Sequence, residues 1–98
     1  MGYYTQYSLS YHTDEQTTQQ IEAYQEGNES MKYCLTDGQR GKWYEWERDM
    51  MAMSRAFPSV AFVLEGVGEE YPDIWRATFY GGCVKKEKAV ITFKEEVK

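Results

Sequence analysis

The sequence predicts an α+β two-layer sandwich, in which a mostly antiparallel sheet of about five strands carries two helices on one face. Four large apolar side chains recur at helical spacing: Trp46, Met50, Met53 and Phe57. Pro58 ends that helix, and the apolar run at residues 60–64 follows it as a strand. Elsewhere, several short segments alternate between apolar and polar residues, as half-buried strands do. The 98 residues are predicted to form a single α+β domain, 1–98, because a chain of this length builds one hydrophobic core.

The first strand is predicted at residues 3–11, whose side chains alternate strictly. One side of it carries Tyr3, Thr5, Tyr7, Leu9 and Tyr11. A short second strand is predicted at residues 31–35, where Met31, Tyr33 and Leu35 alternate with other residues. Residues 37–41 contain turn-forming residues and are expected to be a loop.

The first helix is predicted between these strands, at residues 14–26. Thr13 and Gln16 form a capping box, in which the Thr13 hydroxyl accepts from a helical amide and Gln16 reaches back. Gly27 follows as a natural helix-ending residue. The apolar face of this helix is thin and centres on Ile21, so we expect it to pack weakly.

The second half of the chain continues the pattern. A second helix is predicted at about residues 43–57, and a polar connection that contains glycine at residues 65–73. Residues 74–80 alternate again, and the glycine pair at 81–82 fits a two-residue hairpin turn into a last strand at 84–93. The predicted order is therefore β-α-β-α-β-β-β.

Catalytic and cofactor chemistry finds little support in the composition. His12 is the only histidine, so paired-imidazole and histidine-rich metal sites are excluded. Cys34 and Cys83 are far apart in the sequence and are expected to be free, structural thiols in a reducing cytosol. We predict no enzyme activity, no catalytic residue, no cofactor and no metal-ligand set.

Charge is the most informative functional signal. Five acids and no base occur between residues 14 and 29: Asp14, Glu15, Glu22, Glu26 and Glu29. The net charge is −5 and the isoelectric point is about 4.8, which argues against a direct nucleic-acid binder. Such a helix either only keeps the surface solvated or presents a negative stripe to a basic protein surface.

Aromatic and acidic residues supply further candidate contacts. Trp43 and Tyr44 are expected to be partly exposed at a helix start, either as ordinary packing residues or as anchors for a partner. Four carboxylates fall on the predicted connection: Glu65, Glu69, Glu70 and Asp73. Glu65, Glu69 and Glu70 are predicted to contribute to the surface that binds the partner. Otherwise this acidic loop is either solvated or, as an alternative, a weak site for a hard cation or a small molecule.

The sequence also bears on location and on membrane association. No apolar run approaches the ~20 residues of a membrane span. The opening residues lack the basic and apolar regions of a secretory signal. We therefore expect a location in the cytoplasm of a host cell and no membrane partner.

A series of short motifs runs through the second half of the sequence. It consists of Lys42–Trp43–Tyr44, Asp49–Met50, Ser54 with Phe57–Pro58, Glu65 to Glu70, and Asp73 with Trp75. These residues resemble a pattern of KWY, DM, LS and FP followed by a GEGEE turn and GDxW, which is found in a family of small phage and prophage proteins. Three positions depart from it: Met53 stands for Leu, Val67 for Glu, and Tyr71–Pro72 for a Gly. The resemblance implies an origin in a mobile element and a small α+β fold, and most such proteins have no assigned activity.

These observations lead to three hypotheses. The first is a non-enzymatic phage or prophage accessory protein that binds a host protein through an acidic and aromatic surface. It would act as a counter-defence inhibitor of the anti-CRISPR kind on a basic nucleic-acid-binding surface. The second is a metal- or small-molecule-binding module that uses the acidic loop. The third is a self-associating structural module, such as a homodimer.

Overall fold

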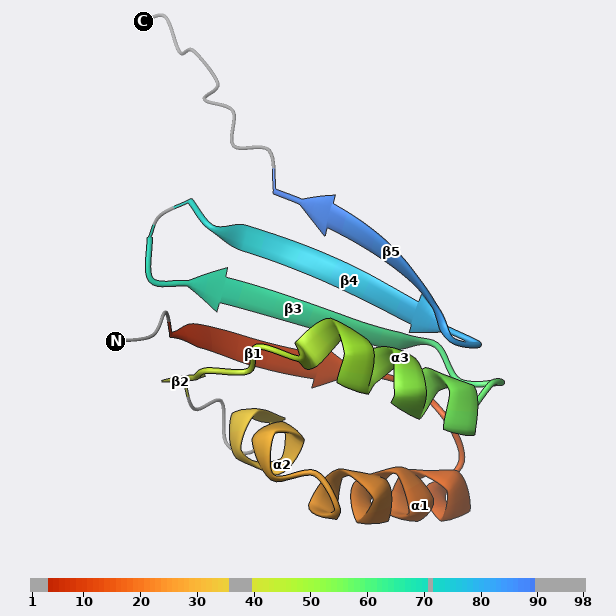
Figure 1. Cartoon of the computed structure of the whole chain (residues 1–98). Helices are drawn as coiled ribbons and strands as arrows, with labels where there is room; N and C mark the ends of the chain where they lie inside the picture. Colours follow the sequence, from red (N-terminus) through yellow and green to blue (C-terminus); the bar gives the residue numbers. More distant parts are fainter. Residues whose placement is uncertain (1–3, 36–39, 71, 90–98) are drawn as a thin grey trace, which may run out of the picture.

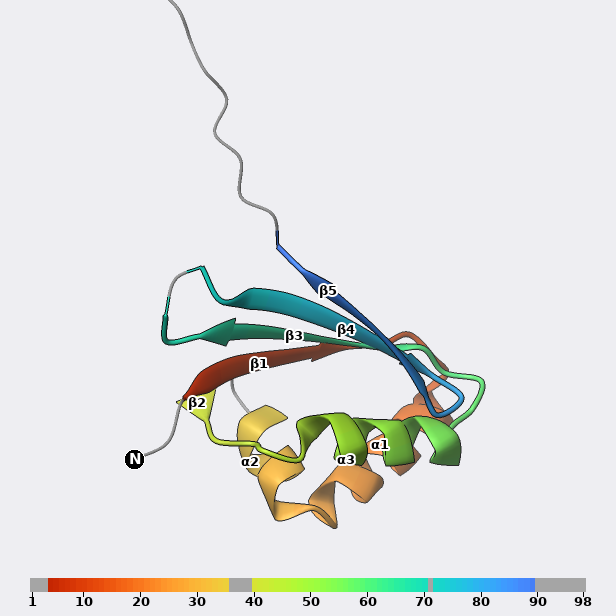
Figure 2. The same cartoon turned by 45° about the horizontal axis from the view of Figure 1, so that its top comes forward.

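The computed structural model describes residues 4–35, 40–70 and 72–89. Within them, a five-stranded antiparallel sheet in the order β2-β1-β3-β4-β5 carries its helices on one face, as Figures 1 and 2 show. The elements are β1 (Thr5–Ser10), α1 (Glu15–Glu26), α2 (Glu29–Leu35), β2 (Arg40–Gly41), α3 (Trp46–Ala56), β3 (Phe62–Gly68), β4 (Ile74–Tyr80) and β5 (Cys83–Lys88). The predicted α+β class with helices on one face is confirmed, and the number of described helices is three rather than two.

The first strand and helix follow the prediction closely. Thr5 and Tyr7 of β1 are buried against the helices, as the alternation requires. Ile21 is the buried residue of α1, and Gly27 caps its end. The predicted capping residue is wrong by one position, because Asp14, not Thr13, accepts the Thr17 amide at 2.6 Å. That hydrogen bond lowers the pKa of the Asp14 carboxyl below its ordinary value, because it stabilises the charged form.

The predicted second strand is wrong: residues 29–35 form the helix α2. Asn28 begins this helix by accepting the Met31 amide on its side chain at 3.0 Å. Met31 and Cys34 are both buried, three residues apart, as on one face of a helix. Burial of Met31 and Cys34 on one helix face outweighs the preference for a strand that the alternation of the sequence indicates. The second strand is instead β2, two residues long, in the segment expected to be a loop.

The second half of the chain is closest to the prediction at β4, which has the predicted bounds. Helix α3 begins at Trp46, later than predicted, and β3 continues to Gly68, through residues expected to be a loop. This extension is stabilised by pairing on both sides, with β1 and with β4. Gly81 and Gly82 have φ values of 58° and 85°, as the predicted hairpin turn requires. Of the predicted last strand, residues 90–93 lie outside the described residues.

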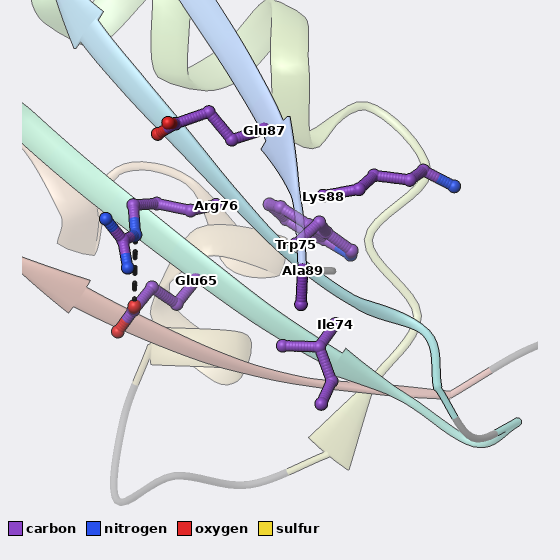
Figure 3. Close-up of a pocket in the computed structure, with 7 residues that line it drawn as sticks. All are labelled: Glu65, Ile74, Trp75, Arg76, Glu87, Lys88 and Ala89. Carbon is purple, nitrogen blue, oxygen red and sulfur yellow. Dashed lines mark ion pairs between the residues drawn. The ribbon is translucent and has the colours of Figure 1, made fainter. Parts of the chain in front are cut away.

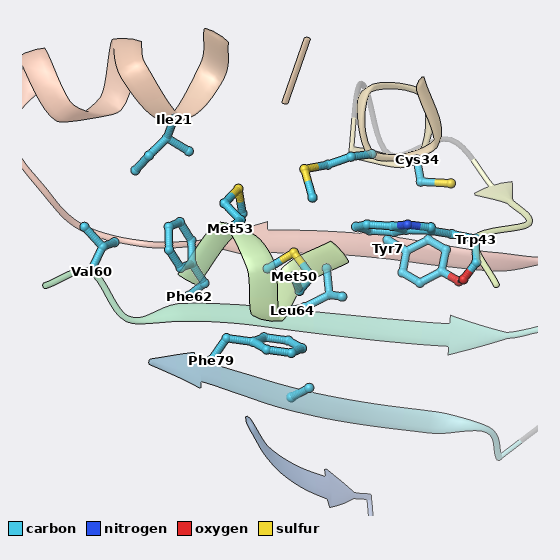
Figure 4. Packing of buried hydrophobic residues seen from close by; sticks show 12 residues of the cluster. Tyr7, Ile21, Cys34, Trp43, Met50, Met53, Val60, Phe62, Leu64 and Phe79 are labelled. Atoms are coloured by element: carbon cyan, nitrogen blue, oxygen red, sulfur yellow. The ribbon is translucent and has the colours of Figure 1, made fainter. Parts of the chain in front are cut away.

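The core lies between the helices and the sheet (Figure 4). Its buried hydrophobic residues are Tyr7, Ile21, Met31, Cys34, Trp43, Met50, Met53, Val60, Phe62, Leu64, Ala77 and Phe79. The predicted stripe on α3 is confirmed, with Met50 and Met53 fully buried and with Trp46 and Phe57 partly buried against the core. Each of the three described helices contributes buried residues to this core.

In one row of residues across the sheet, the backbone of Gly66 lies close to the ring of Trp75. In the strand register, Tyr7 lies opposite Gly66, Gly66 opposite Trp75, and Trp75 opposite Lys88. These four residues therefore face the helices. The Trp75 indole occupies the space above Gly66 in which a side chain would otherwise stand. Glycine is required at this position by the neighbouring ring, because any side chain would overlap it.

A buried serine connects α3 to the hairpin of β4 and β5. The Ser54 hydroxyl donates to the Met51 carbonyl at 2.9 Å and accepts the Gly82 amide at 2.8 Å. Replacing Ser54 by alanine is expected to reduce the free energy of unfolding by about 1–3 kcal/mol, because the Gly82 amide loses its acceptor. Urea denaturation measures this, with the exposed Ser59→Ala as the control. Equal stability of the two variants would contradict the assigned role.

Candidate functional site

Five of the acidic residues predicted to bind a partner lie at the N-cap of α1, on α1 and on α2. We call this surface the acidic helical pair; it consists of Asp14, Glu15, Glu22, Glu26 and Glu29, all exposed. Lys32 is the only basic residue between residues 14 and 35, so this segment carries a net charge of −4. Lys32 forms an ion pair with Glu26 at 2.9 Å. The acidic helical pair thus accounts for most of the net charge of the chain.

The lysines of the sheet lie at its edge farthest from α2. Helix α2 packs against β1 and β2, whereas the lysine-rich strand β5 forms the opposite edge of the sheet (Figure 1). Lys85, Lys86 and Lys88 are exposed on β5. The acidic residue Glu29 of α2 and the lysines of β5 therefore lie at opposite edges of the sheet, while Arg40 and Lys42 lie at the same edge as α2. An oriented charge distribution of this kind steers a charged partner toward one face.

Trp43 and Tyr44, predicted to share a partly exposed position, have opposite environments. Trp43 is only 2% exposed, so its expected partial exposure is wrong. Its indole packs edge-on against the Tyr7 ring with a centroid distance of 5.3 Å, and its N–H donates to the Asp49 carboxylate at 2.9 Å. Tyr44 is 75% exposed and remains a candidate contact. Trp43 is a core residue that no partner can reach in the folded protein.

A hollow of about 440 Å³ lies beside the acidic helical pair. Tyr4 from the start of the first strand, Tyr33 and Glu29 from α2, and Lys42 line it. Tyr4 and Tyr33 are 43% and 56% exposed, and the Lys42 ammonium lies 4.8 Å from the centre of the Tyr4 ring. The sequence did not identify Tyr33, because the false alternation of residues 31–35 placed it in a strand. On α2, Tyr33 lies beside Glu29, so the surface there is both aromatic and acidic.

The predicted acidic loop does not form as one cluster. Glu65 lies on β3, where it pairs with Arg76 at 3.4 Å on the face of the sheet that has no helices (Figure 3). Glu69 accepts the Tyr4 amide at 3.0 Å, and a turn joins the Asp73 amide to the Glu70 carbonyl at 2.7 Å. In the part of the chain that the structure describes, no group of three histidine, cysteine or acidic residues could hold a metal ion. The extension of β3 is what removes Glu65 from the expected loop.

The two cysteines are free and differ in environment. Cys34 is buried on α2, and burial raises the pKa of its thiol because the thiolate loses its solvation. Cys83 is exposed on β5. The expectation that they do not pair is confirmed, although Cys34 lies on a helix and not on a strand.

Comparison with family models, with curated proteins and with solved structures gave no match in any of the three cases. The resemblance to phage and prophage proteins therefore stays a prediction. Among the described helices, none has the length and apolar character needed to cross a membrane. Function is therefore inferred from the exposed surfaces of the fold.

Proposed function

We propose that this chain is a non-enzymatic phage or prophage accessory protein that binds a host protein through its acidic helical pair. One observation carries this proposal: a segment of net charge −4, within a chain of net charge −5, lies exposed on two adjacent helices. A surface of this kind is complementary to a basic surface on a partner, and the attraction speeds the encounter. The partner class that fits it best is a protein with a basic groove for nucleic acid.

The positions of the acidic residues on α1 support this proposal. Helix α1 buries Ile21 and leaves its glutamates outside, so these side chains contribute little to the core. Maintaining like charges close together costs stability unless a partner neutralises them. Functional binding to a basic surface would offset that cost when the complex forms.

The neighbouring hollow adds aromatic surface to the acidic surface. Glu29 belongs to both, and the half-exposed rings of Tyr4 and Tyr33 lie next to it. Tyrosine is enriched among the residues that dominate binding energy, because it buries a large rigid surface while keeping a polar group. In this proposal the carboxylates orient the partner and the tyrosines supply much of the affinity.

Binding in a nucleic-acid groove would make the protein a competitive inhibitor. The acidic helical pair would occupy positions that phosphates take, and the host protein would lose access to its nucleic acid. A counter-defence inhibitor of the anti-CRISPR kind acts in this manner. The activity requires no catalytic residue and no cofactor on this chain.

The test is a charge reversal on the acidic helical pair. Replacing Glu22, Glu26 and Glu29 together by lysine is expected to abolish capture of the host partner, because attraction becomes repulsion. The measurement is co-precipitation of the tagged full chain from host lysate at low and high salt, followed by mass spectrometry and by competition with nucleic acid. High salt is expected to release the wild-type complex.

A matched control reverses the same number of charges elsewhere. Glu45, Glu65 and Glu87 are exposed and lie outside the acidic helical pair, so their triple replacement by lysine is expected to retain binding. Thermal melting of both variants verifies that they are folded. Full binding by the first variant, equal loss in both, or no stoichiometric partner for the folded wild-type chain would contradict the proposal.

A further inference from the structure

A second hollow lies far from the acidic helical pair, between the start of α3 and strands β4 and β5. It has a volume of about 280 Å³ and is lined by Trp46, Trp75, Lys86 and Lys88, with the adjoining Arg76 and Glu87. It forms because β5 is the edge of the sheet and carries lysines where inner strands carry apolar residues. In register, Lys88 lies opposite Trp75 and Lys86 opposite Ala77, so both face the helix side.

The aromatic part of this hollow consists of two stacked indoles. The indoles of Trp46 and Trp75 stack with a centroid distance of 4.4 Å and an angle of 24° between their planes. Gly66 supports Trp75 from the sheet, and Phe79 contacts Trp46 edge-on at 6.2 Å. Both tryptophans remain partly exposed at the hollow. A pair of fixed, partly solvated indoles favours contact with another planar ring.

Four charged residues line the hollow: Arg76, Lys86, Glu87 and Lys88. Lys86 is already neutralised by Glu47, whose carboxylate is 2.9 Å from its ammonium. Lys88 has no ion-pair partner among the residues that the structure describes, and it is the neighbour of Trp75 across the strands. Figure 3 shows Lys88 extending to the side opposite Glu87 and Arg76, whose side chains belong to the other face of the sheet. An ammonium beside two indoles suits a ligand that carries both a ring and a negative charge.

We propose that this hollow binds a small planar aromatic anion. The ring contacts the indoles of Trp46 and Trp75, and the phosphate or carboxylate of the ligand accepts from the Lys88 ammonium. Sites for drug-sized ligands measure about 300–1,000 Å³, so this hollow accommodates one ring system with one small charged group. The site is independent of the proposed partner surface, because it uses β4, β5 and α3 and not α1 or α2.

The experiment titrates the full chain, labelled with ¹⁵N, with adenosine monophosphate and separately with indole-3-acetate. The three tryptophans each give one indole N–H signal. The signals of Trp46 and Trp75 are expected to move saturably, whereas that of buried Trp43, bound to Asp49, stays in place as an internal control. Binding by the nucleotide alone or by the carboxylate alone identifies the ligand class, and either supports the site. The neutral analogues adenosine and indole-3-acetamide are expected to bind about tenfold more weakly.

Two lysines on the same strand give a matched pair of variants. Lys88→Gln is expected to weaken binding about tenfold, because the charge-assisted hydrogen bond is lost. Lys85→Gln removes the same charge from the opposite face of β5 and is expected to leave binding unchanged. The proposal is overturned if neither anion binds at up to about 10 mM. Equal binding of the neutral analogues, or an equal effect of the two lysine variants, also overturns it.

Discussion

Replacing Trp43 by alanine is expected to destabilise the protein by about 3–5 kcal/mol, the range for removing a large aromatic ring from a core. The ring packs on Tyr7 and is almost fully buried, so its loss leaves a cavity between β1 and α3. The indole N–H donor to Asp49 is lost as well. Chemical denaturation followed by circular dichroism measures the change, with the slope of the transition used to verify two-state unfolding.

The adjacent residue provides the control for this prediction. Tyr44→Ala changes a side chain that is 75% exposed and is expected to alter stability by about 0.5 kcal/mol or less. If Tyr44 contacts the proposed partner, the same variant weakens capture while the protein stays folded. A Trp43→Ala variant as stable as Tyr44→Ala would show that the Trp43 ring is not in the core.

Among substitutions that add a single methyl group, Gly66→Ala is expected to destabilise the protein most. The new Cβ would overlap the Trp75 indole, and that ring cannot retreat because Trp46 stacks on it. Overpacking of this kind costs about 1–3 kcal/mol and sometimes more. Thermal melting of the variant measures the loss.

A double-mutant cycle isolates the cause of that loss. In a Trp75→Ala background, the overlap disappears, and Gly66→Ala is expected to have almost no effect. Gly27→Ala is the control, since Gly27 has a helical φ of −79° and its new Cβ would meet its nearest neighbour at an ordinary 3.4 Å. Simple additivity of Gly66→Ala and Trp75→Ala would refute the assigned contact.

The two proposed binding regions are separable by experiment because they use different elements. Charge reversal on α1 and α2 leaves Lys88 and the stacked tryptophans intact, and Lys88→Gln leaves the acidic helical pair intact. Each of the two proposals can therefore be supported or contradicted independently of the other. The two regions are independent because α2 packs against β1 and β2, whereas β5 forms the opposite edge of the sheet.

Much of the architecture was predictable because the spacing of apolar residues within one segment indicates which of them are buried. The stripe of Met50 and Met53, the buried Ile21 and the bounds of β4 all follow from periodicity within one segment. The glycine pair at 81–82 required positive φ values wherever the hairpin lay. The exposure of the acidic helical pair was predictable for the same reason, since charged side chains remain in water.

Apart from the cap of α1, which is displaced by one residue, the errors concern contacts between segments distant in the sequence. Residues 31–35 alternate like a strand, yet burial of Met31 and Cys34 makes them a helix. Glu65 was expected in a loop, but pairing with both β1 and β4 extends β3 through it. Trp43 was expected near the surface, and contact with Tyr7 buries it.

The α+β class, the helix stripe, the hairpin and the acidic character of one segment thus followed from the order of the residues alone. The folded structure was needed to show that α2 is a helix, that Glu65 lies outside the acidic loop, and that Trp46, Trp75 and Lys88 share one hollow. The difference arises from how far apart in the chain the interacting residues are. Periodicity, capping and turn geometry act between neighbours in the chain, whereas strand pairing and ring packing depend on residues that only folding brings together.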